Sequence, residues 1–71
     1  MSMNYAYNYA QIDASTNMCI GVQSRTLELE TLPENWVEIP VNDQNYVGKY
    51  YINGEWYEDA AGTIPWTSSL L

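Results

Sequence analysis

Residues 49–58 read Lys49-Tyr50-Tyr51-Ile52-Asn53-Gly54-Glu55-Trp56-Tyr57-Glu58 and carry the strongest structural signal in the chain. Asn and Gly are the residue types that accept the two positive φ angles of a type I′ turn, so the stretch predicts a β-hairpin. Counting outward from the turn pairs Ile52 with Glu55, Tyr51 with Trp56, Tyr50 with Tyr57, and Lys49 with Glu58. Aromatic pairs and opposite-charge pairs each stabilise such a ribbon by about 0.2–1 kcal/mol, so the register is well specified.

Two further strands are predicted ahead of this hairpin. Residues 5–12 place tyrosines at alternate positions, as expected of a ribbon with one aromatic face. Residues 13–17 are dominated by side chains that bond their own backbone in turns. Residues 18–23 follow as the second strand, which makes this region a second hairpin.

The strand at residues 18–23 is predicted to carry Met18, Ile20 and Val22 on one face, while Gly21 permits a bulge or a close approach of a neighbour. Cys19 is the only cysteine of the chain, which excludes an intrachain disulfide. Its apolar neighbours predict a buried thiol.

The middle of the chain gives weaker signals. Residues 26–30 fit either an exposed edge strand or an acidic loop whose leucines reach back to the core. Pro33 and Pro40 bracket a short strand at residues 36–39, because proline cannot donate to a ladder. Residues 42–48 favour one helical turn that is closed by a glycine.

The pattern as a whole predicts a mainly β fold, a small antiparallel sheet of hairpins with about four or five short strands and at most one short helical turn. A chain of 71 residues supports one core, so residues 1–59 are predicted to form a single small domain. Residues 60–71 lose all periodicity and are predicted to be a flexible C-terminal tail unless their apolar residues dock.

Charge limits the classes of partner. Nine acidic residues face two basic ones, for a formal net charge of -7. Phosphate backbones and anionic membrane surfaces are bound chiefly through Lys and Arg, so nucleic acid and membranes are not predicted partners. The first residues show no signal peptide and no stretch is apolar enough to cross a bilayer. We therefore expect the protein to fold in the cytoplasm or to travel within a larger assembly.

The sequence lacks the combinations of residues that form metal sites or catalytic sites. Zinc sites draw on several Cys and His residues, and this chain has one cysteine and no histidine. The loop at residues 13–17 lacks the spacing of a calcium loop. Glu55 and Glu58 resemble paired glycosidase carboxylates only superficially, since a two-stranded ribbon gives them no enclosing cleft. The sequence predicts no catalytic residue, no metal and no cofactor, and hence no enzyme.

Ten residues are Tyr or Trp and none is Phe, a composition that suits half-exposed positions at interfaces and also suits stacking on sugars. The candidate contacts to a protein or glycan partner are Tyr51, Trp56, Ile64, Trp66, Leu70 and Leu71.

Four short motifs occur in a recognisable order. They are Tyr9-Ala10-Gln11-Ile12-Asp13, Asn17-Met18-Cys19-Ile20-Gly21-Val22, Trp36-Val37-Glu38-Ile39-Pro40, and Val47-Gly48-Lys49-Tyr50-Tyr51-Ile52-Asn53-Gly54-Glu55-Trp56. In this order the chain resembles small domains of tail, tail-fibre and related virion proteins of bacteriophages and prophages. The resemblance implies synthesis in the bacterial cytoplasm, association with a virion, and a structural or attachment role through contacts with itself or with other tail proteins.

The alternative is a small carbohydrate-binding module that uses Tyr51 and Trp56 as a ring platform. Such a module should show coplanar exposed rings beside hydrogen-bonding side chains. An assembly module should show an apolar patch or an unpaired strand edge.

Overall fold

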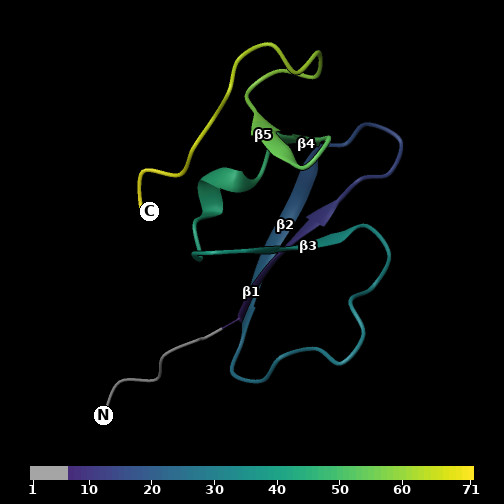
Figure 1. The fold of residues 1–71 in the computed structure, drawn as a ribbon, viewed down its shortest axis with the longest axis vertical. Helices are drawn as coiled ribbons and strands as arrows, with labels where there is room; N and C mark the ends of the chain where they lie inside the picture. The colour runs from purple at the N-terminus through teal and green to yellow at the C-terminus, as the bar shows by residue number, and fades with distance from the viewer. Residues whose placement is uncertain (1–6) are drawn as a thin grey trace.

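The computed structural model describes residues 7–71, which form two small antiparallel sheets and one turn of 3-10 helix (Figure 1). The elements are β1 (Tyr7–Ile12), β2 (Cys19–Arg25), β3 (Trp36–Ile39), η1 (Gln44–Tyr46), β4 (Tyr50–Ile52) and β5 (Glu55–Tyr57). Three strands form one sheet in the order β2-β1-β3, and β4 pairs with β5. The mainly β prediction is confirmed, although the hairpins divide between two sheets. Within residues 7–71 no helix is long and apolar enough to span a bilayer.

The hairpin of β4 and β5 has the predicted register. Tyr50 pairs with Tyr57 and Tyr51 with Trp56, and the pairs continue to the turn. Asn53 has a φ of 52° and Gly54 a φ of 84°, the two positive angles that a type I′ turn requires. The ladder ends at Tyr50, so the predicted pair of Lys49 and Glu58 lies outside it.

A β-bulge interrupts the pairing of β1 with β2. Gln11 pairs with Gly21 but Ile12 pairs with Cys19, so Ile20 is the extra residue. Ile20 is 57% exposed, and the regular alternation that was predicted to place it on one face with Met18 and Val22 is interrupted here. The bulge reverses the alternation of side chains at this position, and the buried Cys19 takes the inward place. Gly21 makes the predicted close approach, because a Cβ there would lie 2.5 Å from Oε1 of Gln11.

The core lies on one face of the three-stranded sheet. Its buried apolar residues are Ala10, Cys19, Ile39 and Tyr46, which come from β1, β2, β3 and η1. Partly buried Trp56 and Trp66 pack against this cluster from the hairpin and the C-terminal segment. The core therefore joins the three-stranded sheet to η1, to β5 and to the C-terminal segment.

That loop belongs to the opposite face of the sheet. Tyr9 is buried there with its ring centroid 6.3 Å from that of Trp36, and its hydroxyl accepts a hydrogen bond of 3.2 Å from the backbone N–H of Leu29. Residues 26–30 form no strand, so of the two alternatives the loop is the one observed. Leu29 reaches back toward the sheet, whereas Leu27 is exposed.

Backbone hydrogen bonds connect the two sheets at the start of β2. Cys19 donates to the carbonyl of Lys49 at 2.8 Å and accepts from Gly48 at 2.9 Å, while Tyr51 donates to the carbonyl of Asn17 at 2.9 Å. These bonds hold the hairpin above the core of the larger sheet.

Residues 60–71 fold back along the hairpin, as the yellow segment in Figure 1 shows. The carboxylate of Asp59 accepts hydrogen bonds from the backbone of Thr63 and Ile64, which reverses the chain. Pro65 then forms a bridge with Tyr57, and Trp66 donates to the carbonyl of Trp56 at 3.0 Å. These contacts place Trp66 beside the hairpin.

Candidate binding site

Two tryptophans from separate segments meet above one buried tyrosine. Trp56 comes from β5 and Trp66 from the C-terminal segment. Each indole lies 4.8 Å from the ring of Tyr46 between centroids, at interplanar angles of 68° and 78°. Edge-to-face pairs at this separation are favourable, so Tyr46 holds both indoles in place.

Two hollows share these indoles in their walls. One measures about 210 Å³ and is lined by Glu38, Ile39, Pro40, Tyr46, Trp56, Trp66, Thr67, Ser68 and Leu71. The other measures about 380 Å³ and is lined by Glu55, Trp56, Pro65, Trp66 and Thr67. We call the two hollows together the tryptophan groove, because both indoles border each of them.

A buried carboxylate supports one wall of the groove. Asp43 is 3% exposed and accepts hydrogen bonds from the hydroxyl of Ser68 at 2.5 Å and from the backbone of Asn45 at 2.9 Å. The bond from Ser68 is the main cause that lowers the pKa of Asp43, and the positive charge of Lys49 adds to it. Asp43 is therefore ionised at neutral pH and attaches the C-terminal segment to the start of η1.

Lys49 lies against one indole of the groove. Its Nζ lies 5.2 Å from the centroid of the Trp66 ring, within the range of a cation–π interaction. Lys49 does not line either hollow. One indole of the groove thus already has a cation against its ring.

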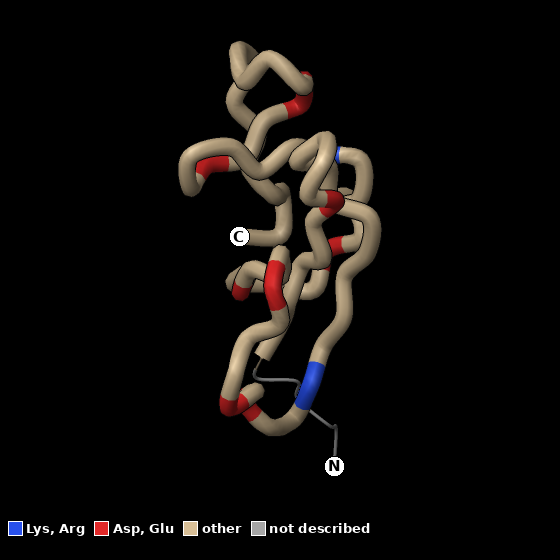
Figure 2. The backbone as a smooth tube through the Cα atoms, turned by 90° about the vertical axis from the view of Figure 1, so that its right-hand side faces the viewer, with Lys and Arg blue, Asp and Glu red and all other residues tan. Residues whose placement is uncertain are grey.

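Glu55 is held in place at the other end of the groove. The hydroxyl of Tyr57 donates a hydrogen bond of 2.8 Å to Oε2 of Glu55, and this bond is the main cause that raises the pKa of Tyr57. Red positions occur along the whole tube in Figure 2, and the two blue positions are far apart. Among residues 7–71, the charged residues that line the two hollows are Glu38 and Glu55.

The candidate contacts predicted from the sequence divide into two groups. Trp56, Trp66 and Leu71 line the groove, and Tyr51 packs on Trp56 with ring centroids 4.9 Å apart. Ile64 and Leu70 are exposed and line neither hollow. The Tyr51 and Trp56 rings are inclined by 53°, so they do not form a flat platform.

Sequence reasoning did not name Tyr46, Thr67 or Glu38 as site residues. They come from η1, the C-terminal segment and β3, and only the fold brings them together. The aromatic side chain of Tyr46 within the predicted helical turn was the one signal that could have identified it.

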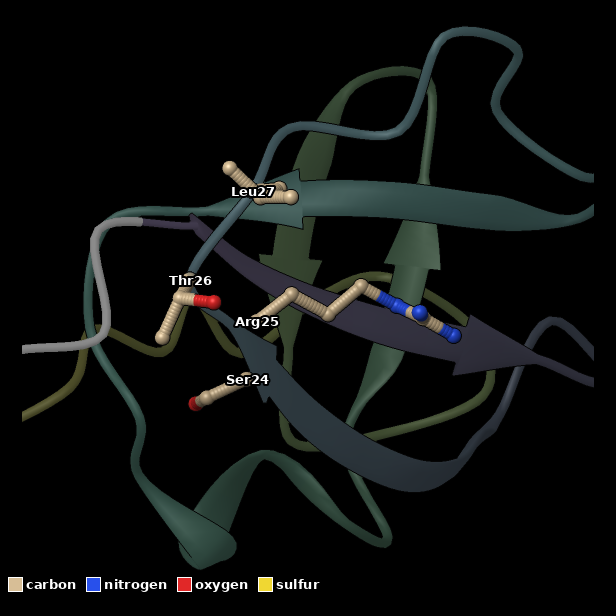
Figure 3. Close-up of a pocket in the computed structure, with 4 residues that line it drawn as sticks. All are labelled: Ser24, Arg25, Thr26 and Leu27. Carbon is tan, nitrogen blue, oxygen red and sulfur yellow. The ribbon is translucent and has the colours of Figure 1, made fainter.

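A further hollow of about 320 Å³ lies at the end of β2, where it is lined by Ser24, Arg25, Thr26 and Leu27 (Figure 3). The side chain of Arg25 runs across β1, whereas Ser24 and Thr26 point away from it. Four consecutive residues form its described walls, so a ligand would touch one segment only. The tryptophan groove, with walls from several elements, is the better candidate.

Cys19 is the one thiol of the chain and lies in the core. Its Sγ is 3.3 Å from the carbonyl oxygen of Gly21, and burial raises its pKa. The thiol is therefore protonated and enclosed. Among residues 7–71 no group of three or more His, Cys, Asp or Glu side chains is arranged to hold a metal ion.

Comparison of the chain with models of protein families, with curated proteins and with solved structures finds no match. The geometry of the groove and the chemistry of the sequence are therefore the grounds for assigning a function.

Proposed function

We propose that this protein is a non-catalytic structural or attachment module of a phage or prophage tail-type assembly, and that it binds a partner protein through the tryptophan groove. One observation carries the proposal: Trp56 and Trp66 come from separate segments, are half-buried over Tyr46, and border two adjoining hollows. Trp and Tyr in such pockets are the residues that most often contribute the binding energy of protein interfaces.

The C-terminal segment adds apolar surface beside the groove. Ile64, Leu70 and Leu71 are all exposed, and Leu71 also lines the smaller hollow. An interface with a groove of aromatic residues and an apolar margin suits a protein partner. The assignment to tail-type assemblies draws on the order of the four sequence motifs.

A catalytic role has less support than a binding role. The only thiol is enclosed in the core with a raised pKa, and the chain has no histidine that could act as its base. The carboxylates that border the hollows, Glu38 and Glu55, are both exposed, with one at each hollow. The groove offers surface for contact and no activated group.

The alternative of a small carbohydrate-binding module is less consistent with the ring geometry. Sugar rings stack on flat exposed aromatic faces, whereas the paired rings of residues 7–71 are inclined by 40° to 78°. Thr67 and Glu55 would supply hydrogen bonds to a sugar in the larger hollow, and glycan binding is therefore a separate arm of the test.

The test uses a photo-cross-linking amino acid at position 67, which lines both hollows, in cells that produce the particle. A matched variant carries the cross-linker at position 30, an exposed site in the loop between β2 and β3. We expect the chain in purified tail particles and a cross-link from position 67, not from position 30, to another tail protein. Absence from the particles, or glycan-array binding without any protein cross-link, would contradict the proposal.

A further inference from the structure

The charged side chains that line the tryptophan groove are negative. Glu55 lines one hollow and Glu38 the other, and both residues are exposed. No Lys or Arg is among the described residues that line either hollow. The whole chain carries a net charge of -7, so this part of the surface attracts cations.

This charge selects among the possible occupants. A second copy of the chain would bring an equal negative charge to the groove, and like charges that meet at an interface oppose binding. A basic segment of another protein would meet complementary charge. The same argument disfavours an acidic or phosphorylated segment.

We propose that the tryptophan groove binds a basic segment of the partner protein, with an arginine as its anchoring side chain. This inference rests on the proposed function and specifies the chemistry of the partner. The guanidinium group is flat, always charged, and able to stack on an indole while it forms paired hydrogen bonds with a carboxylate. Trp56 and Trp66 supply the rings, and Glu55 or Glu38 supplies the charge.

Two contacts inside the protein bear on this choice. The ammonium of Lys49 lies 5.2 Å from the centroid of the Trp66 ring, so a guanidinium stacked on Trp66 would meet a like charge and Trp56 is the more favourable ring. The hydrogen bond from Tyr57 restricts the carboxylate of Glu55, which reduces the entropy that an incoming guanidinium would have to remove.

The experiment follows the indole N–H signals of the three tryptophans by NMR in the whole chain. The probe is a capped tripeptide of the sequence arginine-leucine-arginine, and the controls are capped glutamine-leucine-glutamine and glutamate-leucine-glutamate. Trp36 serves as an internal reference, because it lies against Tyr9 and lines neither hollow. We expect saturable shifts of the Trp56 and Trp66 signals with the arginine peptide, weaker shifts with the neutral peptide, and a constant Trp36 signal.

A matched pair of variants tests whether the charge of Glu55 contributes to binding of the arginine peptide. Glu55→Gln should lower the affinity for the arginine peptide by about two- to fivefold, as for an exposed ion pair. Glu30→Gln removes the same charge from the loop between β2 and β3 and should leave the affinity within error of the parent. The spectra themselves show whether both variants are folded.

The remaining outcomes overturn the inference in distinguishable ways. Equal binding of the neutral and arginine peptides would mean an apolar site, so the basic partner would be rejected while the protein-binding function stands. Binding on the glycan array, with no protein cross-link and no shift from any peptide, would reject both. If no peptide moves the Trp56 and Trp66 signals, the arginine anchor is rejected and cross-linking alone decides the proposed function.

Discussion

The hydroxyl of Ser68 donates a hydrogen bond of 2.5 Å to the carboxylate of Asp43, 25 positions earlier in the chain, and both residues are almost fully buried. Asp43 also caps the turn of 3-10 helix by accepting from the backbone N–H of Asn45. One carboxylate therefore organises η1 and attaches the C-terminal segment at the same time.

Replacement of Ser68 tests this attachment. Ser68→Ala leaves a buried carboxylate short of one donor, so the melting temperature should fall. Amide hydrogen exchange at Trp66 should also become faster. Ser69→Ala is the matched control, because Ser69 is exposed in the same segment and should melt like the parent. Equal melting of both variants would show that the bond contributes nothing.

Asp43 should also respond to pH. Ser68 lowers the pKa of Asp43 below its ordinary value of 3.8, so the contribution of Asp43 to stability is fully present above pH 3.8. That contribution is lost as the pH falls further, through the folded-state pKa. A carboxyl NMR titration should place the pKa of Asp43 below 3.8 in the parent and closer to 3.8 in Ser68→Ala. A pKa that is the same in both proteins would contradict the assigned cause.

A β-branched residue at position 54 should destabilise the turn of the β4–β5 hairpin. Gly54 has a positive φ and no atom lies within 4 Å of a Cβ built on it, so the cost of substitution is backbone strain alone. Gly54→Val should lower the free energy of unfolding by at least about 1 kcal/mol in denaturant melts. Asn53→Gly keeps the positive φ accessible and should change the free energy of unfolding little. A Gly54→Val protein as stable as the parent would exclude the type I′ assignment.

Trp56 should be important for stability as well as for binding. Its ring contacts Tyr46 and Tyr51 and packs against the core. Trp56→Ala should therefore cost about 3 kcal/mol in the free energy of unfolding. Trp56→Phe keeps a ring against Tyr46 and should cost clearly less. Parent-like melting of Trp56→Ala together with lost partner binding would assign this residue to the interface alone.

The elements that could be predicted from the sequence are those with local signals. Asn53 and Gly54 specify the hairpin turn, and Pro33 and Pro40 bracket the strand at residues 36–39. Each signal depends on residues that are adjacent in the chain. The predicted alternation of side chains in β2 fails at Ile20, because a single extra residue reverses which side chains face the core.

The site could be predicted only in part. Trp56, Trp66 and Leu71 were among the candidate contacts and line the groove. Tyr46 and Thr67 were not, because Tyr46 reaches the groove through the packing of η1 in the core and Thr67 through the folding back of residues 60–71. That arrangement rests on contacts between distant residues and leaves no periodic pattern in the sequence.

The tryptophan groove is built from several separate segments, so a partner can recognise it only after folding is complete. Its walls come from β3, η1, β5 and the C-terminal segment, and the hairpin can form locally before that segment arrives. A molecule whose last residues are still detached lacks Trp66, Thr67 and Ser68 as walls. A partner that recognises the groove would therefore accept finished molecules and pass over unfinished ones, so that the binding step itself acts as quality control during assembly.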